Sequence, residues 1–180
     1  MKMHRASGLL FALLAAPAFA QMGGPPAGGS MPVQRPTLNA FAHDAAIGGM
    51  AEVELGRLAA EKGTDPAVKA FGQQMVDDHT KINADLKAIA AHAGVSLPDS
   101  VGSKQKKVFD KLSALSGAAF DRAYIDDMVE DHKDDISAFE KASRFSGDSP
   151  FKMFATSQLP TLREHLKMAE AAQATLKAAK

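Results

Sequence analysis

The sequence contains one short pattern twice: it reads MVDDH at residues 75–79 and MVEDH at residues 128–132. Each copy lies in a long stretch whose apolar residues recur every three or four positions, which is the spacing of an amphipathic helix. In both copies a carboxylate and an imidazole stand where the apolar stripe would otherwise continue. The doubled pattern therefore predicts two helices that carry polar side chains in the middle of their buried faces.

The residues around both copies predict an all-α fold. Amphipathic patterns cover four long stretches and one short one, at residues 41–62, 66–92, 118–145, 151–177 and 104–115. Glycine, proline or capping residues separate these stretches, and none shows the sustained alternation of a half-buried strand. We therefore expect an up-down four-helix bundle with one short extra helix.

Two further expectations concern the helices themselves. The two copies of the pattern fall in the second and fourth helical stretches along the chain, which suggests an internally duplicated helical hairpin. Pro160 lies inside the last stretch and is expected to kink or restart that helix, because proline removes one backbone hydrogen bond.

A shared polar layer is expected at mid-bundle. The histidines of the doubled pattern lie near the midpoints of their helices, and similar positions in the first and last helices also carry carboxylates or a histidine. Packed helices of similar length bring their midpoints to one level. The candidate ligands in this layer are Glu52, Glu54, Asp78, His79, Asp131, His132 and His165.

The order of these residues limits what each can contact. Adjacent residues on a helix point about 100° apart, so an aspartate and the histidine after it reach different neighbours. In one arrangement Asp78 accepts a hydrogen bond from His132, and Asp131 accepts one from His79. In a structural layer, such buried pairs would satisfy one another and fix the register of the helices.

The same side chains also fit a metal site of one of two kinds. A methionine stands four residues before each histidine of the doubled pattern, and a thioether with an imidazole suits a soft ion such as Cu(I). Carboxylates with imidazoles suit Zn, Mn or Fe instead. Bundles with a di-iron site use a Glu-x-x-His spacing, which is absent because valine stands three residues before both His79 and His132. The spacing therefore argues against a ferritin-type oxidase.

The N-terminus predicts export. Residues 1–20 combine a basic start, a short apolar run and the sequence Ala18-Phe19-Ala20, which is typical of a signal peptide cleaved before Gln21. Residues 21–36 are rich in glycine and proline and predict a flexible tether, which leaves residues 37–180 for the bundle. The sequence has no cysteine and no later stretch apolar enough to span a membrane. We expect a disulfide-free periplasmic or secreted protein.

Charge and motifs exclude several functions. The chain holds 21 basic and 21 acidic residues, which argues against a nucleic-acid-binding surface. It contains no nucleophile–base motif, phosphate loop or dinucleotide fingerprint. A metal-dependent enzyme is therefore less favoured than a binding protein.

Several motifs together resemble a known family. They are AEVELG at 51–56, VKAF at 68–71, FDRAY at 120–124, LPTLREHL at 159–166 and both copies of the doubled pattern. In this order they resemble domain of unknown function 4142 (DUF4142), over residues 41–172. The resemblance implies an exported protein with a ferritin-like bundle, of a kind often labelled an outer-membrane protein. It supplies no reaction. The sequence thus leaves two functions open: a module that binds Cu, Zn, Fe or Mn at the polar layer, or a structural or stress-related interaction protein with an inert layer.

Overall fold

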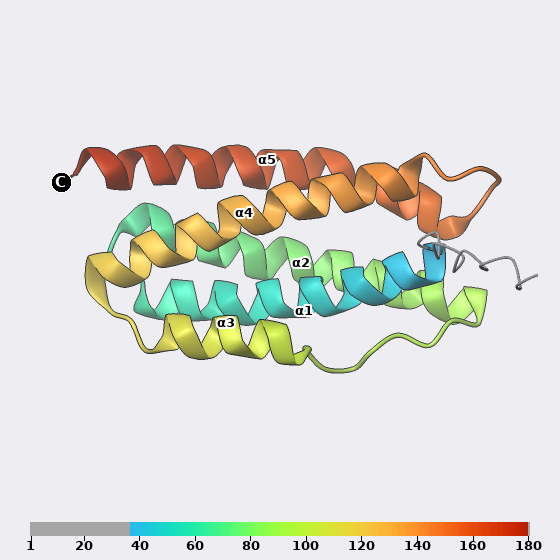
Figure 1. Cartoon of the computed structure of the whole chain (residues 1–180), viewed down its shortest axis with the longest axis horizontal. Coiled ribbons are helices and arrows are strands. Elements are labelled where there is room, and N and C mark those ends of the chain that lie inside the picture. The colour runs from blue at the N-terminus through green and yellow to red at the C-terminus, as the bar shows by residue number, and fades with distance from the viewer. Residues whose placement is uncertain (1–36, 180) are drawn as a thin grey trace, which may run out of the picture. The chain divides into compact units, whose positions relative to one another are not determined.

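The computed structural model describes residues 37–179, which form five α-helices and no strand (Figure 1). The helices are α1 (Leu38–Lys62), α2 (Pro66–Ala93), α3 (Ser103–Ser113), α4 (Gly117–Ser143) and α5 (Pro150–Ala178). The predicted all-α fold with four long helices and one short helix is confirmed. The predicted signal peptide and tether lie outside the described residues. None of the helices in residues 37–179 has the length and apolarity that crossing a bilayer requires.

The four long helices pack as two antiparallel hairpins, α1 with α2 and α4 with α5. α3 carries the chain back along the bundle, so α2 and α4 run in the same direction (Figure 1). The two copies of the doubled pattern lie on the second helix of one hairpin and on the first helix of the other. They therefore belong to non-equivalent helices, and the expectation of a duplicated hairpin is wrong.

A buried carboxylate links the starts of α2 and α4. Asp121, in the first turns of α4, accepts hydrogen bonds from the backbone N–H groups of Thr64 and Asp65, which precede α2.

Local sequence explains where the helices begin and end. The side chains of Thr37, Asp65 and Ser149 each accept a hydrogen bond from a backbone N–H in the first turn of α1, α2 and α5. Such caps satisfy donors that have no partner within the helix. α2 is capped by Gly94, the residue after its end, whose φ of 68° lies in the left-handed region that favours glycine. α5 runs through Pro160 without restarting.

α1 and α2 approach one another closely at two glycines. A Cβ added to Gly56 would lie 2.7 Å from the carbonyl oxygen of Gly72, and one added to Gly72 would lie 2.7 Å from that of Gly56. Only residues without a side chain allow this backbone contact. Glu52 lies one turn before Gly56 on α1, so the contact holds its side chain close to α2.

The hydrophobic core is divided into two clusters. One contains Leu55, Met75, Met128 and Ala169, together with Leu112 of α3, and the other contains Phe41, Ile82, Phe139 and Leu162, among other residues. On each long helix, one buried polar residue lies in sequence between the members of the two clusters. These four residues are Glu52, His79, His132 and His165. The expected polar layer is therefore present, between two apolar halves of the bundle.

Candidate metal centre

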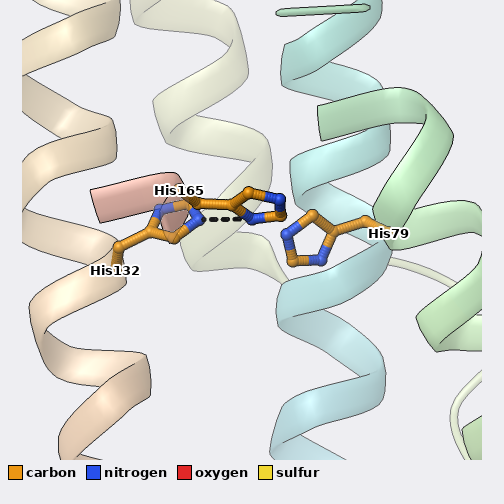
Figure 2. Close-up of side chains that lie close together, drawn as sticks. All are labelled: His79, His132 and His165. Carbon is orange, nitrogen blue, oxygen red and sulfur yellow. Dashed lines mark hydrogen bonds between the residues drawn. The ribbon is translucent and has the colours of Figure 1, made fainter. Parts of the chain in front are cut away.

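Three imidazoles from three different helices meet in the polar layer. His79 of α2, His132 of α4 and His165 of α5 turn their rings toward one another (Figure 2). Their ring centroids are 5.3 to 6.0 Å apart, and one nitrogen of each ring lies within 4.8 Å of the others. All three side chains are at most 2% exposed. A buried histidine triad of this kind offers three ligands to one ion.

Glu52 of α1, the remaining long helix, reaches the same point. Its Oε2 lies 2.8 Å from Nδ1 of His79, and its Oε1 lies 3.4 Å from Nε2 of His132. Neither approach has the geometry of a hydrogen bond: both nitrogens of His79 and Oε1 of Glu52 are buried without a hydrogen-bond partner. Buried polar groups are normally hydrogen-bonded. These three atoms are therefore exceptional, because no residue of the layer supplies a hydrogen-bond partner for them.

The hydrogen bonds of the other two histidines show where their protons lie. Nδ1 of His132 is 3.0 Å from the carbonyl oxygen of Met128, which can only accept. Nε2 of His165 is 3.0 Å from Oδ2 of Asp78. Both nitrogens therefore donate. In the neutral rings, Nε2 of His132 and Nδ1 of His165 are left as acceptors, and these two atoms face each other at 3.4 Å.

Two facing acceptors need a cation or a proton between them, and burial disfavours the proton. Burial lowers the pKa of His132 and of His165, although the carboxylates of Glu52 and Asp78 partly oppose this. Burial also lowers the pKa of His79 to about 4. The imidazoles are therefore neutral near pH 7, which is the form that binds metals.

The two carboxylates of the layer differ in their electrostatics. Burial raises the pKa of Glu52 to about 8, an effect that His132 opposes and Asp131 strengthens. Partial burial also raises the pKa of Asp78, but hydrogen bonds from Gln74 and His165 outweigh it and leave the pKa below its usual value. Asp78 is therefore an ionised acceptor that orients His165, as carboxylates commonly do behind metal-binding histidines.

Comparison with known proteins places the chain in a family. A model of "Domain of unknown function (DUF4142)" matches residues 24–172. The chain belongs to the DUF4142 family. The fold is similar to the crystal structure of a DUF305 protein from Streptomyces coelicolor that is proposed to be secreted, with a TM-score of 0.65 and 15% identity over 78% of this chain and 94% of that one. At this identity the likeness concerns the fold alone. No curated protein matches the sequence.

The DUF4142 domain brings five of the seven candidate residues together in the polar layer or directly beside it. They are Glu52, Asp78, His79, His132 and His165. Asp78 pairs with His165 and not with His132, because α5 lies beside α2 at this level. Asp131 forms no hydrogen bond with His79; one of its carboxylate oxygens lies instead near those of Glu52 and Asp135. Glu54 lies on the exposed side of α1.

Two features of the site were missed in the sequence. Asp135 stands four residues after Asp131 and so shares its face of α4, a spacing that could have revealed it. A surface hollow of about 340 Å³ reaches Asp78 and His165 and is lined also by Gln74, Pro160, Thr161, Glu164 and Met168. It brings solvent to the outer edge of the layer, and no sequence signal indicates it.

Proposed function

We propose that this DUF4142 domain is a metal-binding module that holds one transition metal ion at His79, His132 and His165. Glu52 serves as the fourth ligand. The observation that carries the proposal is the pair of unprotonated nitrogens of His132 and His165, which face each other at 3.4 Å beside a His79 ring whose nitrogens have no hydrogen-bond partner. A cation at this point would give a partner to one nitrogen of each of the three rings and to the carboxylate of Glu52.

The donor set favours particular ions. Three imidazole nitrogens and one carboxylate oxygen suit Zn²⁺ in a tetrahedral site or Cu²⁺, whereas Mn²⁺ prefers sites richer in oxygen. Bonds of about 2.0–2.1 Å would draw the nitrogens to about 3–4 Å from one another. The rings must therefore turn slightly inward from a spacing that now reaches up to 4.8 Å. The methionines before His79 and His132 belong to the hydrophobic core, so a thioether-bound Cu(I) site is less favoured.

Export of the module is part of the proposal. The signal-peptide pattern of residues 1–20 supports it, and it agrees with the proposed secretion of the DUF305 protein of similar fold. In the periplasm or outside the cell, the hollow beside Asp78 and His165 would face the metal pool of the surroundings. The protein would then take up, hold or deliver an ion.

Metal analysis of protein purified without a tag tests the proposal. We expect about one zinc or copper ion per chain, or, in stripped protein, a melting temperature that rises on adding Zn²⁺ or Cu²⁺. At a metal concentration of 100 Kd the stabilisation is about 2.7 kcal/mol, which corresponds to about 5–10 °C in a domain of this size. His79→Ala and His132→Ala should abolish the rise.

His92→Ala is the matched control. His92 is an exposed residue near the end of α2, and its Nδ1 lies 2.8 Å from the carbonyl oxygen of Ala88. Its loss should leave the metal response unchanged. A wild-type protein that retains no metal and shows no shift with Cu, Zn, Mn or Fe would overturn the proposal.

A structural polar layer is the second candidate, and two observations favour it. His132 is bonded to the carbonyl oxygen of Met128, and His165 to Asp78, as a layer that only fixes helix register requires. This function does not account for the unpartnered nitrogens of His79. It predicts that metals leave the melting temperature unchanged and that protein partners bind elsewhere on the bundle.

A further inference from the structure

The four side chains proposed to hold the ion are almost completely closed off from solvent. Glu52, His79, His132 and His165 are each at most 2% exposed, and the two apolar clusters of the core lie on either side of their layer. Hydrophobic packing does not admit a hydrated ion, because removing its water costs far more than the packing can return. An ion from solution therefore needs a path through the wall of the bundle.

Asp78 marks a place where solvent comes close to the layer. Its side chain is 21% exposed, and its Oδ2 lies 3.0 Å from Nε2 of the buried His165. Both residues line the hollow of about 340 Å³ between α2 and α5. Solvent in this hollow thus reaches a carboxylate that is bonded directly to a proposed ligand.

One oxygen of Asp78 is available to an arriving cation. Oδ2 accepts hydrogen bonds from Gln74 and His165, whereas Oδ1 accepts no hydrogen bond in the part of the chain that the structure describes. Lys81 lies 3.7 Å from Oδ1, but its side chain is largely exposed, and exposed pairs of this kind contribute little. A cation can therefore bind Oδ1 while Oδ2 still holds His165 in place.

The size of the hollow suits a hydrated metal ion. A divalent ion with six waters occupies about 200 Å³, at about 30 Å³ for each water, and the hollow of about 340 Å³ exceeds this. Glu164 also lines the hollow and is exposed, so its charge adds to that of Asp78 in attracting cations.

We infer that this hollow is the route by which the metal ion enters and leaves, and that the hydrogen bond between Asp78 and His165 is its gate. The hydrated ion binds Asp78 first. The hydrogen bond then breaks, and the ring of His165 turns to admit the ion to His79 and His132. The inference rests on the proposed function, because it concerns the same ion.

Narrowing the hollow tests the route. Thr161 lines it and is half-buried on α5, so Thr161→Trp places a bulky side chain there. Obstruction of a shared path raises the barrier equally in both directions. We therefore expect the association and dissociation rate constants of Zn²⁺ to fall together by about 10-fold, with an unchanged dissociation constant. Stopped-flow mixing with a zinc indicator measures association, and a chase with excess chelator measures dissociation.

Thr175→Trp is the matched control, because Thr175 is an exposed threonine of α5 outside the hollow. Both of its rate constants should equal those of the wild type. Circular dichroism and the melting temperature verify that each variant folds.

A smaller change tests the route independently of the tryptophan. Glu164→Gln should slow zinc association at low ionic strength, and the difference from wild type should fade as salt screens the charge. Glu170→Gln is its control, since Glu170 is an exposed acid of α5 that pairs with Lys133 outside the hollow. It should slow association less.

The outcomes separate the route from the proposed function. If zinc binds and both rate constants are unchanged in Thr161→Trp and in Glu164→Gln, the ion enters elsewhere; the inference is overturned and the proposed function stands. A dissociation constant that rises in Thr161→Trp as much as association slows would also overturn it, because the substitution would then have damaged the site and not the route. If the wild type binds no metal, the proposed function itself fails.

Discussion

At the residue scale, the decisive property of the site is the direction of its protons. Met128 offers His132 a carbonyl oxygen, and Asp78 offers His165 a carboxylate, so both rings present their free nitrogen to the same point. The sequence indicated that Asp78 and the histidines would share a layer, because each interrupts an apolar stripe at mid-helix. It could not indicate which aspartate faces which histidine, because that depends on the rotation and neighbours of each helix.

Asp78 therefore acts as a positioning residue, and its replacement should weaken metal binding without unfolding the protein. Asp78→Asn removes the charge that holds the proton on Nε2 of His165. Loss of such a partner typically lowers metal affinity about 10- to 100-fold. A competition titration with a chromophoric chelator measures this for Zn²⁺. Asp77→Asn is the control, because Asp77 is exposed and bonded only to Gln73. Equal affinities in the two variants would contradict the role of Asp78.

Glu52 gives the metal-free protein a distinctive pH dependence. Its pKa is raised by burial from 4.5 to about 8, so the folded state holds a proton that the unfolded state releases. This stabilisation is fully present below pH 4.5 and is lost as the pH rises through 8. Because burial lowers the pKa of the three histidines, they add little to the slope above pH 6.5.

Between pH 6.5 and 8.5, urea unfolding of metal-free wild type should show stability that falls with rising pH. In Glu52→Gln the slope should be shallower, because the amide does not titrate. Asp135 contributes in the same direction, since its pKa is also raised, so some slope remains. Saturating Zn²⁺ should reverse the trend, because metal binding favours the ionised carboxylate. Identical slopes in wild type and variant would refute a protonated Glu52.

At the element scale, the glycine contact between α1 and α2 sets the position of Glu52. Helix limits could be predicted to within a few residues because caps, prolines and glycines mark them in the sequence. The contact of Gly56 with Gly72 could not be predicted, because a glycine inside a helix can either allow a close contact or simply weaken the helix, and the sequence does not distinguish these cases. Only the packing of α1 against α2 shows that both glycines are needed for the same reason, the close approach of the two backbones.

Two alanine substitutions in α1 should therefore have opposite effects. Gly56→Ala forces a methyl group against the backbone of α2 and should cost about 1–3 kcal/mol. Gly48→Ala meets nothing within 4 Å and should stabilise the helix by up to about 1 kcal/mol. Chemical denaturation measures both changes, and a zinc titration should show weaker binding in Gly56→Ala alone. If Gly56→Ala were as stable as Gly48→Ala, the close contact would not exist in solution.

At the scale of the whole molecule, one polar layer separates two apolar clusters, and all four long helices contribute to it. The number and type of helices followed from hydrophobic periodicity. The parallel course of α2 and α4 did not, because periodicity carries no information about how α3 leads the chain back. That course nevertheless brings the two copies of the doubled pattern to the same level, so His79 and His132 meet although they belong to different hairpins.

Replacing the whole layer with apolar residues distinguishes a metal site from a structural device. We expect the variant Glu52→Met/His79→Leu/His132→Leu/His165→Leu to fold and, without metal, to be as stable as wild type or more stable by about 1–4 kcal/mol, because buried charged and polar groups often contribute less than well-packed apolar ones. Thermal unfolding with and without Zn²⁺ measures this. Zinc should raise the melting temperature of wild type alone. The layer would instead serve only to fix the helices in register under two conditions. The variant would lose its sharp unfolding transition and dispersed NMR spectrum, and zinc would leave the melting temperature of the wild type unchanged.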